Sequence, residues 1–149
     1  MTPIQEKEWS RLRKYAAAVL CALDSKDNRA YKRYVKRIIN YLDKLDELHG
    51  ISPDTILIRA YYAPDEERSY SLYLKAYHLA QGEGNLPNSI EAAIQINFHW
   101  IVIEENFHEG NKWIKVLQRL IEKDKSSVFV EEYESLKVMC LNLRQGRQS

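Results

Sequence analysis

The segment Arg29–Leu48 constrains the fold of this chain more than any other part of the sequence. Its apolar side chains recur at steps of three and four, which is the period of one face of an α-helix. They are Tyr31, Tyr34, Val35, Ile38, Ile39, Tyr41, Leu42, Leu45 and Leu48. The positions between them hold the basic residues Arg29, Lys32, Arg33, Lys36, Arg37 and Lys44. The pattern predicts a helix with an apolar, aromatic stripe that packs inward and a basic stripe that faces outward.

Glycine and proline are scarce in the rest of the chain, which also favours long helices joined by short loops. Only 5 Gly and 4 Pro are present among 149 residues, too few for the many turns of an all-β protein. The length suits one domain, and 45% apolar residues suffice for a core without disulfides or metal. We therefore expect a single all-α domain over residues 1–149, an array or bundle of about six to seven helices in antiparallel hairpins, with a frayed tail over 143–149.

Turn signals mark where these helices should begin and end. Thr2 and Pro3 resemble a helix start, and polar or glycine-rich turns are expected at 24–28, 49–52, 81–85, 109–111 and 123–127. The helix that begins near Leu86 is apolar nearly all round from Phe98 to Ile103, so it should be central. The β-branched residues there leave a strand as the alternative, although the flanking sequence favours a helix.

One stretch, Leu74–Gln95, resembles a tetratricopeptide repeat, a family that pairs two helices over about 34 residues. The residues at repeat-like positions are Ala76, Tyr77, Gly84, Asn85, Leu86, Ser89, Ile90 and Ala93. A fainter echo follows at Phe107–Leu117. The resemblance covers about one third of the chain and implies a concave surface that binds a peptide or protein segment, without chemistry. Another helical bundle or hairpin array is the alternative fold.

The charges nearly cancel overall but are unevenly distributed. Residues 1–50 carry 11 Lys and Arg against 7 Asp and Glu, net +4, whereas residues 51–149 carry 11 against 14, net −3. The overall charge gives no reason to expect nucleic-acid binding, although the local basic patch leaves it open. The N-terminus lacks a secretory signal, and no apolar run approaches the roughly 20 residues that span a membrane. We therefore expect a cytoplasmic protein, with Cys21 and Cys140 as reduced core thiols rather than a disulfide.

Candidate chemical motifs are weak. Glu105 and His108 have the Glu-x-x-His spacing of di-iron bundles, and Asp46 and His49 repeat it in a weaker form. The further inward carboxylates of such sites are not evident, and a histidine at a helix end is explained by the helix dipole. His78 and His99 lack ligand spacing and are expected to be structural, and motifs for nucleophilic or phosphate chemistry are missing. The sequence therefore predicts no enzyme, no metal and no cofactor.

The function expected from these patterns is non-catalytic binding of a protein or peptide. An adaptor, a chaperone or an immunity-type binder would use a helical-hairpin surface in this way, and a homodimer is left open. The expected binding residues lie on the second and fourth helices: Arg29, Lys32, Arg33, Lys36, Arg37, Tyr34, Tyr41, Tyr70, Tyr73 and Tyr77. Two alternatives stay open for the basic stripe, namely a solvated surface and a nucleic-acid-associated helical subunit.

Overall fold

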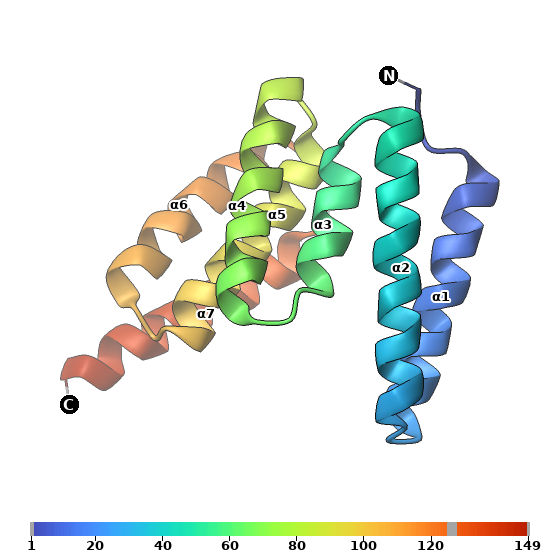
Figure 1. The fold of residues 1–149 in the computed structure, drawn as a ribbon. Helices are drawn as coiled ribbons and strands as arrows, with labels where there is room; N and C mark the ends of the chain where they lie inside the picture. Colours follow the sequence, from blue (N-terminus) through green and yellow to red (C-terminus); the bar gives the residue numbers. More distant parts are fainter. Residues whose placement is uncertain (1, 125–127, 149) are drawn as a thin grey trace.

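The computed structural model describes residues 2–124 and 128–148, and over these residues the protein has seven α-helices, one π-helical segment and no strand. The all-α class is thereby confirmed. The elements are α1 (Glu6–Asp24), α2 (Asn28–His49), α3 (Pro53–Tyr61), α4 (Glu66–Glu83), α5 (Leu86–Phe98), the π-helical η1 (His99–Ile103), α6 (Phe107–Lys123) and α7 (Val130–Gln148) (Figure 1). No helix in this part of the chain is both long and apolar enough to cross a membrane.

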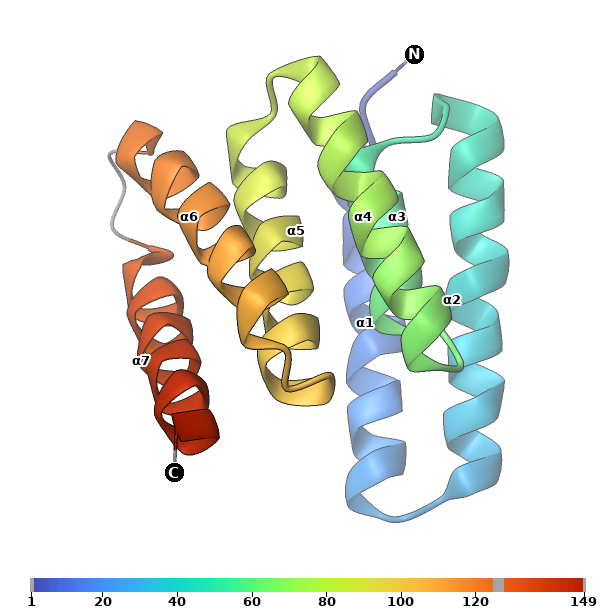
Figure 2. The ribbon, with the colours of Figure 1, turned by 90° about the vertical axis from the view of Figure 1, so that its left-hand side faces the viewer.

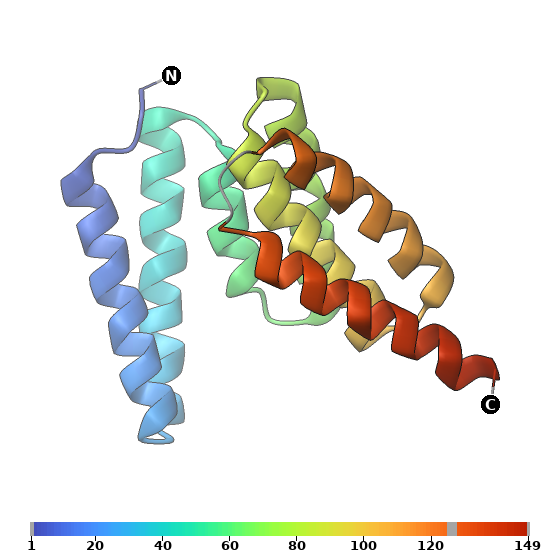
Figure 3. The same cartoon turned by 180° about the vertical axis from the view of Figure 1, so that it is seen from behind.

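Each helix packs antiparallel against the next one in the chain, which arranges the molecule in two regions. The hairpin of α1 and α2 stands at one side, and α3 to α7 form a layered body beside it (Figures 1 and 2). The hairpin meets the body mainly where α2 contacts α3. Seen from behind, α7 crosses in front of the body, and the two chain ends lie at opposite sides of the molecule (Figure 3).

Three apolar clusters hold these layers together. The hairpin cluster contains Leu12, Val19, Ile38, Leu42 and Leu45 and reaches the body through Ile58 and Tyr62 of α3. The central cluster of α3, α4 and α5 is rich in alanine, with Ala60, Ala76 and Ala92 almost completely buried. The third joins α5, η1, α6 and α7 around Leu117, Leu136 and Cys140. Small side chains let helix backbones approach closely, so the body packs more tightly than long aliphatic residues alone would allow.

Capping side chains explain where most helices begin. In five of them, an Asp, Ser or Asn oxygen accepts a hydrogen bond from the backbone N–H three residues on. The caps are Asp27, Ser52, Asp65, Asn85 and Asn106. The helix α4 ends at Gly84, whose φ of 67° lies in the left-handed region that glycine adopts without strain. The turn between α4 and α5 is therefore shorter than the expected loop at 81–85, because α4 continues through Glu83.

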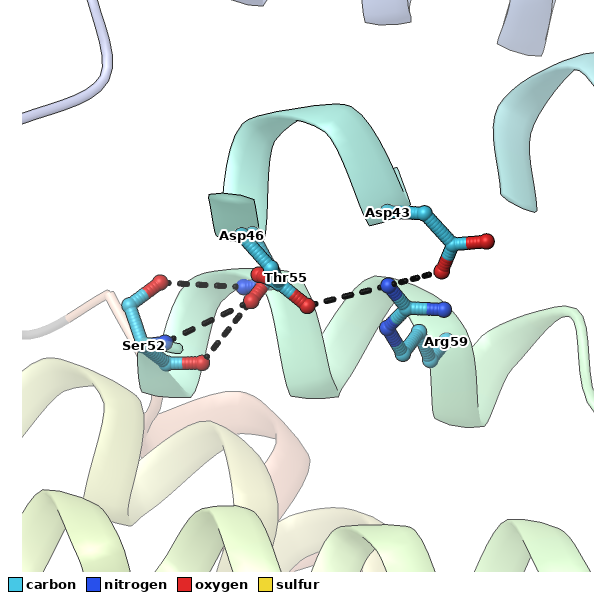
Figure 4. A network of polar contacts seen from close by, with 5 residues as sticks. All are labelled: Asp43, Asp46, Ser52, Thr55 and Arg59. Atoms are coloured by element: carbon cyan, nitrogen blue, oxygen red, sulfur yellow. Dashed lines mark hydrogen bonds and ion pairs between the residues drawn. The ribbon is translucent and has the colours of Figure 1, made fainter. Parts of the chain in front are cut away.

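A polar network fixes α3 against α2 at the junction of the two regions (Figure 4). The Arg59 guanidinium donates from Nη2 to Asp43 Oδ1 at 2.7 Å and to Asp46 Oδ2 at 2.9 Å. At the start of α3, the side chains of Ser52 and Thr55 each accept a hydrogen bond from the other residue's backbone N–H. One arginine of α3 thus joins two acidic residues of α2 to the body.

Three sequence-based expectations about local structure are wrong. The first helix begins at Glu6 rather than at Thr2, with Gln5 as its cap. The segment 99–103 is a π-helix, so neither a regular α-helix nor the alternative strand forms there. The chain turns at 104–106 instead of 109–111, and Gly110 lies inside α6, buried against η1. A Cβ atom at Gly110 would lie 2.7 Å from Ile101 Cγ1, so glycine is required by this close approach.

The two cysteines are both free, but only Cys140 is a core thiol. It is 3% exposed, and burial raises the pKa of its thiol. Cys21 is exposed on α1. The end of the hairpin extends beyond the body, so Leu20 and Leu23, which the helical period places inward, are 59% and 54% exposed.

Candidate functional site

The cations expected to bind a partner all lie on the outward side of α2. Arg29, Lys32, Arg33, Lys36 and Arg37 are exposed, and among the residues that the structure describes none of the five is paired with a carboxylate. Their spacing of three and four residues brings like charges close together along the helix. Such repulsion destabilises a helix, so packing within the hairpin does not explain this pattern.

The neighbouring face of α1 enlarges this basic surface. Lys7 and Arg11 of α1 and Lys44 of α2 line a hollow of about 290 Å³, together with Tyr41, Leu48 and the acidic Glu8. The Arg11 guanidinium carbon lies 5.5 Å from the centre of the Tyr41 ring. We call a set of eight exposed cations on this side of the hairpin the cationic face: Lys7, Arg11, Arg29, Lys32, Arg33, Lys36, Arg37 and Lys44.

Two tyrosines hold arginines of this face in place. The guanidinium carbons of Arg33 and Arg37 lie 5.2 and 5.3 Å from the centre of the Tyr34 ring, within the range of a cation–π contact. Tyr41 is packed edge-on against Tyr15, with ring centres 6.1 Å apart. Both Tyr34 and Tyr41 are half-buried at the seam with α1. The two rings therefore contact and help to order Arg11, Arg33 and Arg37.

The three tyrosines expected on α4 are separate from the cationic face. Tyr70 stacks on His99 with ring centres 4.4 Å apart, and Tyr77 packs edge-on against Trp113 at 5.2 Å. Tyr73 is 9% exposed and belongs to the central cluster. Burial, followed by the Glu91 carboxylate, raises the pKa of Tyr73 to about 12. The structure thus brings Tyr34 and Tyr41 together with the basic residues but places the α4 tyrosines in the body.

A second concave surface, which the sequence did not indicate, lies between the two regions. This inner groove has a volume of about 360 Å³ and takes residues from α1 to α5. Its aromatic lining comes from Trp9, Tyr61, Tyr62 and Tyr73, and Glu91 is its acidic residue. The adjacent Tyr61 and Tyr62 could have suggested it, because two neighbours at the end of a helix cannot both face the core.

The histidine and acidic pairs singled out in the sequence do not converge. Asp46 pairs with Arg59, whereas His49 Nε2 donates to the Glu8 carboxylate at 2.9 Å and its Nδ1 lies 2.6 Å from Thr2 Oγ1. His108 is exposed in the first turn of α6, whereas it was expected at the C-terminal end of a helix. Nor does the described part of the chain contain a group of three or more His, Cys, Asp or Glu placed to hold a metal ion.

His78 and His99 differ from each other in their surroundings. His99 is half-buried on Tyr70 and lies 3.7 Å from a Glu104 oxygen, as expected for a structural histidine. His78 is exposed on α4, contrary to that expectation.

No family model, curated protein or solved structure matches this chain.

Proposed function

We propose that this protein is a non-catalytic binding module whose cationic face receives an acidic surface or segment of a partner protein. The observation that carries the proposal is the set of exposed, unpaired cations on α2, two of which lie over the Tyr34 ring. Like charges at a spacing of four residues destabilise a helix by about 0.2–0.5 kcal/mol for each pair. A partner with carboxylates in the matching places would remove that repulsion.

Ordering of the arginines also supports binding. A long side chain loses rotamer freedom when it is immobilised at an interface, at about 0.5–1.5 kcal/mol each. Arg33, Arg37 and Arg11 already contact tyrosine rings in the free protein, so part of this freedom is lost before a partner arrives. Arginine also binds carboxylates through two parallel hydrogen bonds, which favours it over lysine at the centre of such a surface.

An acidic protein fits the cationic face better than a nucleic acid does. Proteins that bind single strands stack bases on accessible aromatic rings, but Tyr34 and Tyr41 are half-buried and already contacted by arginines. The net charge of the chain is only +1, whereas nucleic-acid-binding domains are typically strongly basic. A nucleic acid bound to the same residues is the outcome that would replace this proposal.

The binding test compares two probes of similar negative charge. Fluorescein-labelled deca-glutamate and a labelled 11-nucleotide single-stranded DNA are titrated by fluorescence anisotropy at 100 mM salt. We expect the peptide to bind at least tenfold more tightly than the DNA. Tighter binding of DNA, with a steep loss between 50 and 200 mM salt, would favour the nucleic-acid alternative.

Charge reversal on α2 identifies the surface responsible. We expect Arg33→Glu with Arg37→Glu to weaken the binding of deca-glutamate at least tenfold without lowering the melting temperature, since the change relieves like-charge repulsion. The matched control is Lys115→Glu with Arg119→Glu, the same charge change at two exposed positions of α6. Equal loss of binding in both variants would mean that net charge, not the cationic face, attracts the peptide.

Three other expectations stay predictions. They are the relation of residues 74–95 to tetratricopeptide repeats, the absence of catalysis and the cytoplasmic location. The short turn at Gly84 makes a compact α4–α5 hairpin, which supports the first of them.

A further inference from the structure

The inner groove between the hairpin and the body has a chemical character opposite to that of the cationic face. Its walls are aromatic and aliphatic, from Trp9 on α1 across Tyr61 and Tyr62 of α3 to Tyr73 on α4. Tyr61 is 69% exposed and meets Tyr62 edge-on, with ring centres 5.0 Å apart. A concave site of about 360 Å³ with several aromatic side chains has the size and composition of a ligand-binding site.

One carboxylate in this groove lacks a cation. Glu91 projects from α5 into the lining, and within residues 2–124 and 128–148 no Lys, Arg or His is paired with it. Glu91 is exposed at the mouth of the groove, so its carboxylate is accessible to a ligand. Partial desolvation by its neighbours, and then the nearby Asp54 carboxylate, raise its pKa above the ordinary 4.5.

The cation that lines the groove, Arg13, is not paired with Glu91. Its guanidinium is paired with Glu6 on the same helix. The Glu66 carboxylate adds to the field, since it raises the pKa of Tyr73 together with Glu91. Negative charge and aromatic rings are the two features that stabilise an organic cation, the first by ion pairing and the second by cation–π contact.

We propose that the inner groove binds an arginine or lysine side chain, flanked by apolar residues, from a partner polypeptide, with its charged head on Glu91 and its stem against the aromatic walls. Charge complementarity selects this occupant, because the groove lining places the Glu91 carboxylate beside aromatic rings while its own cation, Arg13, is paired with Glu6. The proposal does not depend on the cationic face, which attracts the opposite charge. The protein would then bind through two faces of the same hairpin.

The test uses a small probe and its neutral isostere. N-acetyl leucyl-arginyl-leucine amide is titrated into the ¹⁵N-labelled full chain, and the peptide with citrulline in place of arginine serves as the uncharged control. The indole N–H signal of Trp9 reports on the groove, and those of Trp100 and Trp113 report on the body. We expect a saturable shift of Trp9, with the citrulline peptide binding at least tenfold more weakly.

A second arm tests Glu91 itself. We expect Glu91→Gln to weaken binding of the arginine peptide at least tenfold and to leave the fold intact, since it removes an unfavourably placed charge. Glu134→Gln, at an exposed position of α7, is the matched control and should bind like the unchanged protein. Equal affinity for the arginine and citrulline peptides, or unchanged affinity in Glu91→Gln, would overturn the proposal. Equal binding of n-butylguanidine and the peptide would overturn the assignment to a polypeptide.

Discussion

The hairpin and the body use their aromatic and charged residues in different ways. In the body, Tyr70, Tyr77 and the neighbouring tryptophans pack against other rings, and alanines bring the helices close together. In the hairpin, arginines lie over Tyr34 and Tyr41, and the cations of the cationic face are exposed to solvent. The body is thus organised for packing, whereas the hairpin carries like charges at helical spacing, which lowers helix stability, and holds some of them in fixed places.

Truncation of one leucine in each region should have the largest effect. Leu42 and Leu117 are both fully buried, so we expect Leu42→Ala and Leu117→Ala each to lower the free energy of unfolding by about 2–5 kcal/mol. The hairpin joins the body through few contacts, so Leu42→Ala should speed hydrogen exchange mainly in α1 and α2, while Leu117→Ala should act on α5 to α7. Identical exchange patterns in the two variants would mean that the regions unfold as one unit.

Two glycines test how tightly the body is packed. Adding a methyl group in Gly110→Ala forces the new Cβ against Ile101, so we expect it to destabilise the protein by about 1–3 kcal/mol. Gly82 lies in α4 with no atom near its would-be Cβ, and Gly82→Ala should stabilise by about 0.5–1 kcal/mol. Urea denaturation measures both, and the account of the body would be wrong if Gly110→Ala were also stabilising.

The ion pairs between α2 and α3 should contribute about as much to the free energy of unfolding as one buried hydrogen bond. Arg59→Met leaves Asp46, which is mostly buried, without its cation, so we expect a loss of about 1–3 kcal/mol. Arg68→Met, which removes an exposed pair with Asp65, is the matched control and should cost less than 1 kcal/mol. Thermal melts give the difference, and equal losses would show that the network in Figure 4 adds nothing to the junction.

Acid should loosen only the start of the hairpin. The backbone N–H of Gln5, followed by His49, lowers the pKa of Glu8 below 4.5. A lowered carboxyl pKa contributes stability above the unfolded-state value, and this contribution is lost as pH falls through the folded-state value. We expect the protection factors of amides at the first turn of α1 to fall as pH drops below 4.5, and Glu8→Gln to show reduced protection there already at pH 7. A variant that exchanged like the unchanged protein at pH 7 would contradict this role of Glu8.

The sequence was sufficient to predict the helices and the cationic residues, because both depend on the local period of three to four residues. It was insufficient for the π-helix at 99–103, whose β-branched residues are compatible with several structures. Gly110 was expected in a turn because the local sequence does not reveal the reason for the glycine. That reason is the close approach to Ile101, which is a tertiary contact. The inner groove was missed for the same reason: Trp9, Tyr61 and Glu91 are far apart in the chain and come together only through packing.

We expect the outward face of the hairpin to bind the partner while the body supports the hairpin. A map of backbone amide shifts in the ¹⁵N-labelled full chain, titrated with deca-glutamate, tests this most directly. The account predicts saturable shifts along α2 from Arg29 to Lys44 and on α1 near Lys7 and Arg11, with α6 and α7 unaffected. Shifts confined to the body, or none at millimolar peptide, would contradict it.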